Sequence, residues 1–290
     1  MPFFTHDAHF WRRLARLGAS RFPEWWVRYS PPVFGVAAAI VVPSARHAVE
    51  ENLLRVRGAR SPLADALDVA RTFSTYASCL AEVLSNGSKN ERLPRAAILN
   101  EPNVQEALAA KRGIVMVTMH TAGWETVGPL MMRERAREVV MVMAREPNEQ
   151  ARALQDKARL AAGGMKVTHI GEDPLAPLGL LHHLRKGGVV ALQLDRTPPG
   201  IRARDVTLFD APGKLPEGPL RLASLSGAPI LPIFCARTGY RDYVIDVRPP
   251  ITLPRRPSNA EMKAAAQRLA DEMTRFLRLH PTQWFHFERG

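Results

Sequence analysis

The stretch Gly113-Ile-Val-Met-Val-Thr-Met-His120-Thr-Ala-Gly-Trp-Glu125 joins an apolar run of strand length to a histidine and a turn. Residues 114–119 are almost wholly apolar, as is typical of a strand buried on both faces of a parallel sheet. Gly123 favours a tight turn, and helical periodicity follows over residues 125–135. The stretch therefore predicts a strand that passes directly into a helix, with His120 at the carboxyl edge of the sheet.

Apolar runs of strand length alternate with helix-period segments through the rest of the chain. We expect strands at residues 114–119, 139–143, 166–170, 189–194, 230–235 and 243–247. Helices are expected at residues 125–135, 149–162, 177–185 and 218–226. This alternation predicts an α/β fold with a mostly parallel central sheet of six to seven strands and helices on both faces. Ligands of such sheets bind at the carboxyl ends of the strands.

Helical segments flank this core on both sides. Apolar residues at helical spacing between 44 and 85 predict two helices, separated by a break at residues 57–61. Ser258-Asn-Ala-Glu261 is a capping box that predicts the start of a last helix. Without a repeat or a clear linker, we expect one domain over residues 1–290, made of a helical N-terminal layer (1–100), an α/β core (113–250) and a C-terminal helix (258–280).

The composition is that of a folded and strongly basic protein. Of the 290 residues, 46% are hydrophobic, which is sufficient to bury a core without disulfides or metals. The formal net charge of +12 attracts anionic lipid headgroups, nucleic acid or an acidic carrier protein. Cys79 and Cys235 form no Cys-x-x-Cys pair, so we expect neither a disulfide framework nor a zinc site, and a reducing cytosolic setting is the simpler interpretation.

The N-terminal region bears on membrane association. Its longest apolar run, residues 31–43, is shorter than the ~20 residues that a spanning helix needs, and residues 1–13 lack the apolar segment of a signal peptide. Residues 8–30 interleave aromatic and arginine side chains, which is typical of an amphipathic helix lying at a membrane surface. The alternative is an N-terminal helix packed on its own domain.

His120 and Glu125 are the candidates for chemistry. A strand end, a tight turn and a first helical turn can bring the carboxylate back to the imidazole. A carboxylate on one ring nitrogen fixes the tautomer and raises the basicity of the other nitrogen, as a general base for an alcohol requires. Free backbone amides at the helix start can stabilise an oxyanion. The same spacing also arises by chance, and a lone histidine at a strand end is more often structural.

This segment resembles the H-x4-D/E box of the glycerolipid-type acyltransferases, and more narrowly that of the lipid A biosynthesis (lauroyl/myristoyl) acyltransferase family and its phosphatidylinositol mannoside acyltransferase relatives. Trp124-Glu125 match the common His-x-Gly-Asn-Trp-Glu form of the box, whereas Ala122-Gly123 replace Gly-Asn. Residues 187–232 and the tail His280-Pro-Thr-Gln-Trp-Phe are similar to further family segments. The resemblance implies a glycerolipid-acyltransferase-like fold with His120 as base and Glu125 as its partner.

The resemblance also implies residues that bind substrate. It places the second family box at Asp195-Arg196, where the carboxylate can accept hydrogen bonds from acceptor hydroxyls and the guanidinium can grip a phosphate or carboxylate. The alternatives are an internal salt bridge of Asp195 that orders its loop, and Glu217 as the acceptor-binding carboxylate. Arg145 follows a strand at the same sheet edge and suits an acceptor phosphate or the phosphopantetheine of a carrier, unless it is a solvated loop arginine.

Gly123, in the turn after the strand, is the fourth residue expected to contribute to the substrate site. Trp284 is assigned to packing. The pair His182-His183 lacks the carboxylate of the condensation-domain box and has no further metal ligands at suitable spacing, so no metal site is expected. Motifs of serine hydrolases, NTPases and dinucleotide enzymes are absent, and the short basic clusters disfavour nucleic-acid binding.

The resemblance thus implies an O-acyltransferase that moves a fatty acyl chain from an acyl carrier protein or coenzyme A thioester to a hydroxyl of a lipid or glycolipid, lipid A-type or related. It requires no cofactor beyond the acyl-ACP or acyl-CoA co-substrate. The expected partners are an anionic membrane surface and acyl carrier protein, with the protein peripheral on the cytoplasmic face of the inner membrane. The alternatives are an inactive membrane-docked lipid-binding protein and a thioesterase-like hydrolase.

Overall fold

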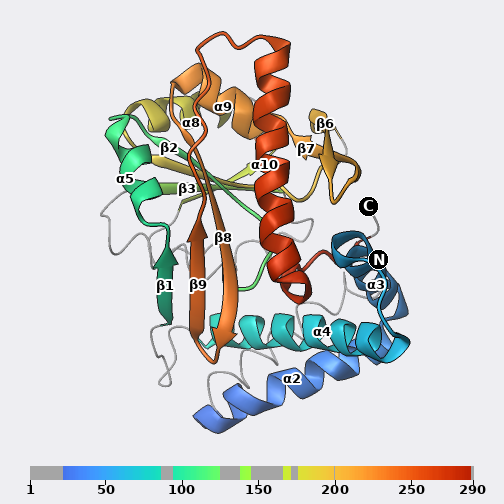
Figure 1. The fold of residues 1–290 in the computed structure, drawn as a ribbon. Coiled ribbons are helices and arrows are strands. Elements are labelled where there is room, and N and C mark those ends of the chain that lie inside the picture. Colours follow the sequence, from blue (N-terminus) through green and yellow to red (C-terminus); the bar gives the residue numbers. More distant parts are fainter. Residues whose placement is uncertain are drawn as a thin grey trace.

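The computed structural model describes residues 22–85, 94–124, 138–144, 166–170, 176–198 and 200–288. Its centre is a seven-stranded sheet in the order β1 (Arg95–Leu99), β9 (Asp242–Val247), β8 (Ile230–Gly239), β2 (Ile114–Thr118), β5 (Val189–Gln193), β3 (Val139–Ala144) and β4 (Lys166–Ile170). All neighbours pair in parallel except β8 and β9, which are antiparallel. The predicted mostly parallel sheet is confirmed (Figure 1).

Apolar cores lie on both faces of this sheet. On one face, β2 and β5 side chains join those of α8 (Ala176–Arg185), α9 (Gly218–Ser226) and α10 (Asn259–Leu279) in one buried cluster. On the other face, Val104 and Ala107 of α5 (Pro102–Ala109) pack against Ile114 and Val189. Because successive strand residues point to opposite faces, the almost wholly apolar β2 contributes side chains to both clusters.

Several predicted elements have the bounds that the sequence indicates. The helix over residues 218–226 begins and ends as predicted, and Ser258 and Glu261 form the reciprocal capping box that opens α10. The predicted helices over residues 125–135 and 149–162 lie outside the described residues. Three strands were not predicted, namely β1 and the separate hairpin of β6 (Ala203–Leu208) and β7 (Ala211–Pro216).

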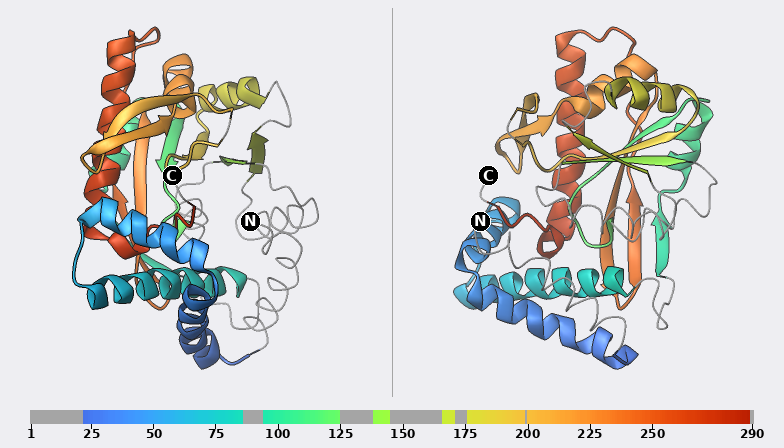
Figure 2. Two further views of the ribbon diagram at one scale, coloured as in Figure 1. Left: turned by 90° about the vertical axis from the view of Figure 1, so that its right-hand side faces the viewer. Right: turned by 180° about the vertical axis from the view of Figure 1, so that it is seen from behind.

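Three helices, α2 (Glu24–Val41), α3 (Pro43–Arg57) and α4 (Pro62–Leu84), form an N-terminal layer at one end of the sheet. In the right-hand view of Figure 2, α2 and α4 lie beyond the ends of β8 and β9, and α2 packs on α4. The backbones of α2 and α4 approach closely at Gly35, where a side chain would collide with the backbone at Phe73. A bulky residue at this position would therefore separate the two helices.

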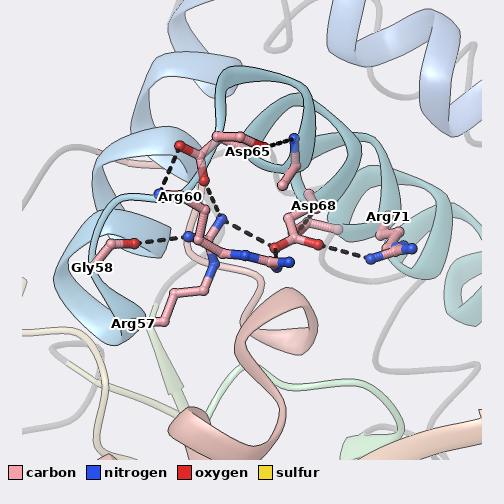
Figure 3. A network of polar contacts seen from close by, with 9 residues as sticks. Arg57, Gly58, Arg60, Asp65, Asp68 and Arg71 are labelled. Atoms are coloured by element: carbon pink, nitrogen blue, oxygen red, sulfur yellow. Dashed lines mark hydrogen bonds and ion pairs between the residues drawn. The ribbon is translucent and has the colours of Figure 1, made fainter.

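The predicted break between α3 and α4 is confirmed at residues 58–61, where a network of arginines and aspartates stabilises the turn (Figure 3). The Asp68 side chain is only 4% exposed and forms ion pairs with three guanidinium groups. They belong to Arg57, Arg60 and Arg71. Arg57 also bonds to Asp65, so one carboxylate on each of two successive turns of α4 is tied to the end of α3.

Within the described ranges, no single helix is both long and apolar enough to cross a membrane. The helices α2 and α3 meet the criteria of length and composition only as a pair, and their axes are bent by 99°.

Candidate active site

His120 and Asp195 occupy equivalent positions on neighbouring strands. Each lies two residues beyond the end of its strand, His120 after β2 and Asp195 after β5. These strands are parallel, with Thr118 directly opposite Gln193. Equal offsets from paired residues bring the two side chains to the same point on the carboxyl edge of the sheet.

The two side chains are in direct contact. His120 Nδ1 lies 2.9 Å from Asp195 Oδ1, and the His120 backbone N–H donates to both carboxylate oxygens at 3.2 Å. The indole Nε1–H of Trp284 donates to Asp195 Oδ2 at 2.9 Å. The Asp195 side chain has no exposed surface, whereas that of His120 is 20% exposed. A buried carboxylate is therefore paired with an imidazole that solvent can reach.

The Asp195 carboxylate is ionised at neutral pH. Burial by itself raises its pKa, but three neighbours outweigh burial and lower the pKa from 3.8 to about 2. These neighbours are His120, through its charge and hydrogen bond, then the indole of Trp284, then the Arg196 guanidinium. Because an ionised carboxylate only accepts hydrogen bonds, the ring proton of neutral His120 lies on Nδ1. The lone pair is then on Nε2, with which no described residue forms a hydrogen bond.

The segment Pro281–Phe287, here named the C-terminal strap, passes across the turn that carries His120. Ala122 N–H donates to Gln283 O at 3.2 Å, and Phe285 N–H donates to His120 O at 2.7 Å. Thr121 and Trp284 form an antiparallel bridge between these two bonds. The strap thus extends the hydrogen bonding of the strand end and fixes the backbone on both sides of the histidine.

The same strap contacts the N-terminal layer. Asn52 of α3 donates to His286 O at 2.7 Å, and the rings of Tyr76 and Phe285 meet edge to face. The ring of Phe287 packs edge to face on Phe73 of α4. The strap therefore lies between the catalytic edge of the sheet and the helices of the N-terminal layer.

Gly123 has a structural role that the sequence only partly indicates. Its φ of +92° favours glycine, and an added Cβ would collide with the ring of Tyr243. The Tyr243 hydroxyl donates to Glu82, which also pairs with Arg237 at 2.8 Å. The amide of Gly123 bonds to the Cys79 thiol, whose pKa is raised to about 12, chiefly by burial. The turn after His120 thus packs directly on a buried polar cluster.

Of the other predicted site residues, those that the structure describes do not share in the contact between His120 and Asp195. Arg196 donates to Phe285 O at 3.2 Å, and its half-buried side chain therefore contacts the strap. Glu217 pairs with Arg204 and Arg221 beside the start of α9. Glu125 and Arg145 lie outside the described residues, so the predicted pairing of Glu125 with His120 stays a prediction.

Sequence reasoning placed His120 and Asp195 at one sheet edge but did not predict their contact. It also assigned Trp284 to packing, whereas the indole donates to Asp195. The contact of His120 with Asp195 could have been predicted from the sequence, because both residues lie the same number of positions beyond their strands. In the part of the chain that the structure describes, no group of three His, Cys, Asp or Glu side chains could hold a metal ion.

Comparison with known proteins identifies the family. The family model for bacterial lipid A biosynthesis acyltransferase matches residues 10–290. The chain belongs to this acyltransferase family. Membership confirms the family resemblance that the sequence predicted and identifies the chain as an acyltransferase of lipid biosynthesis.

Members of known activity are similar over most of the chain. A phosphatidylinositol mannoside acyltransferase of Mycobacterium tuberculosis is 26% identical over 251 residues, which are 83% of this chain and 76% of the relative. The phosphatidylinositol mannoside acyltransferase of Mycolicibacterium smegmatis is 24% identical over 246 residues, 81% of this chain and 76% of the relative. The family model and these relatives are therefore named for different acceptor lipids.

Proposed function

We propose that this acyltransferase moves a fatty acyl chain from the thioester of acyl carrier protein or coenzyme A to a hydroxyl of a lipid or glycolipid. The observation that carries the proposal is the contact between His120 Nδ1 and the buried Asp195 carboxylate. It leaves Nε2 as the basic nitrogen, on a side chain that remains partly exposed. A histidine held in this way is suited to take a proton from an alcohol.

In the proposed reaction, His120 Nε2 takes the proton of the acceptor hydroxyl while the hydroxyl oxygen attacks the thioester carbonyl carbon. Asp195 stays ionised and stabilises the imidazolium, as its pKa of about 2 allows. The tetrahedral intermediate then expels the thiolate by breaking its C–S bond, and the imidazolium returns the proton to the sulfur. The products are an ester and a free thiol, without an acyl-enzyme intermediate.

The remaining predicted residues have supporting roles in this proposal. Glu125 supports His120 as the base, as the resemblance of its segment to the H-x4-D/E box implies. Arg145 and Arg196 provide cations for a phosphate of the acceptor or of the donor. Gly123 shapes the turn, and its predicted contact with substrate stays a prediction.

The exposed face of α2 supports docking at an anionic membrane surface, on the cytoplasmic side where acyl thioesters are available. Apolar and aromatic side chains at helical spacing form one solvent-facing stripe. They are Phe22, Trp25, Tyr29, Val33, Val36 and Ile40. The opposite face of α2, with Val27, Gly35 and Ala39, is buried in the N-terminal layer. Of residues 8–30, for which the sequence left a membrane-surface helix and a packed helix open, 8–21 lie outside the described residues. In α2, the apolar stripe and the buried face lie on opposite sides of the helix.

The test of the proposed function is turnover by His120→Ala with acyl-ACP or acyl-CoA and a lipid acceptor. On the usual scale of general-base catalysis, kcat should fall ~10²-fold or more while the circular dichroism spectrum is unchanged. Near-normal turnover would refute the mechanism. Release of free fatty acid at the same rate with and without acceptor would instead indicate a thioesterase.

A further inference from the structure

Trp284 is held more firmly than a packing residue at a chain terminus needs to be. Its backbone bridges to Thr121, and the bonds from Ala122 to Gln283 and from Phe285 to His120 lie on either side. Trp284 as a whole is only 6% exposed, and the centroid of its ring lies 5.6 Å from that of Phe209. The backbone of Trp284 is therefore held on both sides of the residue, and its indole N–H is directed at Asp195.

The Asp195 carboxylate depends on that N–H for one of its oxygens. Oδ1 accepts the short bond from His120 Nδ1, and both oxygens share the 3.2 Å contact with the His120 amide. Among the described residues, Oδ2 has one other donor, the indole of Trp284 at 2.9 Å. The Arg196 guanidinium donates to Phe285 O and forms no hydrogen bond with the carboxylate.

We propose that Trp284 is a positioning residue, which acts on the reaction through Asp195 and His120. The proposal rests on the proposed function of His120 as base. The terminal torsion of an aspartate is broad, so a carboxylate without a fixed partner on its second oxygen rotates easily. The indole N–H holds Oδ2 and thereby keeps Oδ1 directed at Nδ1 of the imidazole. Without it, the His120 ring is no longer restricted to the Nδ1–H tautomer, and the fraction of molecules with a basic Nε2 falls.

The discriminating variant is Trp284→Phe, which keeps an aromatic ring but removes the donor. Loss of one hydrogen bond to a charged group should lower kcat about 10-fold, while the KM values for thioester and acceptor change less than about 2-fold. Nitrogen-15 NMR of the substrate-free protein, with the His120 signals assigned by their loss in His120→Ala, should change from the Nδ1–H tautomer to a mixture.

Phe209→Leu is the matched control, since it removes a ring that packs on the indole but leaves the N–H in place. It should keep wild-type kcat per folded molecule and a single His120 tautomer. If Trp284→Phe fails to fold, benzothienylalanine introduced at position 284 replaces the N–H by sulfur at nearly constant shape, with the same expectations.

Two results would overturn the positioning role. One is an unchanged His120 tautomer in the variant without the N–H, whatever its kcat. The other is an equal loss of kcat in Phe209→Leu, which would make packing the cause. The NMR measurement needs no substrate, so it separates this proposal from the proposed function. An active His120→Ala enzyme would refute the base, while a tautomer change in Trp284→Phe would still show that the indole positions Asp195.

Discussion

Two buried aspartates in this protein have opposite kinds of partner. Asp68, in the N-terminal layer, pairs with three arginines, so its charge is neutralised by cations from α3, from α4 and from the turn between them. Asp195, at the sheet edge, accepts hydrogen bonds from N–H groups of His120 and Trp284, and from no other residue that the structure describes. A carboxylate paired with arginines stabilises the fold, whereas one whose charge is directed at a single imidazole can also control that imidazole's proton.

The sharpest test of this difference is Asp195→Asn. An amide cannot accept from both His120 Nδ1–H and the Trp284 indole, so the imidazole is driven to the tautomer with its proton on Nε2. Loss of the correct tautomer should lower kcat by about 10³-fold. Steady-state kinetics would show this loss in kcat. A rise in KM for the acceptor with normal kcat would instead support the acceptor-binding role that the sequence suggested for Asp195.

The matching change in the other region is Asp68→Asn. It should reduce the free energy of unfolding by about 2 kcal/mol, because it weakens bonds to charged donors around a buried carboxylate. Urea denaturation would measure the loss, and kcat per folded molecule should be unchanged. Arg71→Ala is the control, since the arginine side chain is 65% exposed and its removal should cost less than about 1 kcal/mol. A large fall in kcat per folded Asp68→Asn molecule would contradict the comparison.

The contribution of Asp195 to stability depends on pH. Because the pKa of Asp195 is lowered to about 2 in the folded state, its ionisation stabilises the protein above about pH 4, and this stability is lost as the pH falls toward 2. Between pH 6 and pH 3 the contribution lost should be about 1 kcal/mol. Urea unfolding of wild type and Asp195→Asn over this range would show a smaller acid dependence in the variant. Equal pH dependence in both proteins would be inconsistent with a depressed pKa.

The smallest expected effect tests how strongly the two regions are coupled. Asn52→Ala removes the bond from α3 to His286 O in the strap, with an expected loss of about 0.5–1 kcal/mol in the free energy of unfolding. The strap keeps its bonds to Ala122 and to His120, so kcat should change less than about 3-fold. Thermal denaturation and kinetics on the same sample would measure both. A 10-fold fall in kcat would mean that the N-terminal layer controls the site.

The regular part of the fold could be predicted because its signals are local. Apolar runs, helical spacing and the capping box at Ser258 each occupy one short window, and they locate β2, α9 and the start of α10. The strands that were missed lack such runs. β1 alternates exposed with half-buried residues, and β7 contains two prolines and a lysine in six positions. Their pairing partners, and not their own composition, make them strands.

The sequence predicted which edge of the sheet carries the site but not the contacts within the site. His120 and Asp195 were both placed there, since each follows an apolar strand. Their contact depends on the register of β2 with β5, which joins residues 75 positions apart. The indole of Trp284 comes from a further 89 residues along the chain and from a segment without regular periodicity. Such contacts are set by tertiary packing, and no local pattern specifies them.

The strap also has a consequence for how the enzyme matures. The ribosome completes the α/β core before it synthesises residues 281–287, so a nascent chain can fold the sheet while Asp195 still lacks its indole donor. We expect catalytic competence to arise only when residues 281–287 have left the exit tunnel and docked on the turn that carries His120. The folded sheet would then exist for some time before the enzyme can turn over.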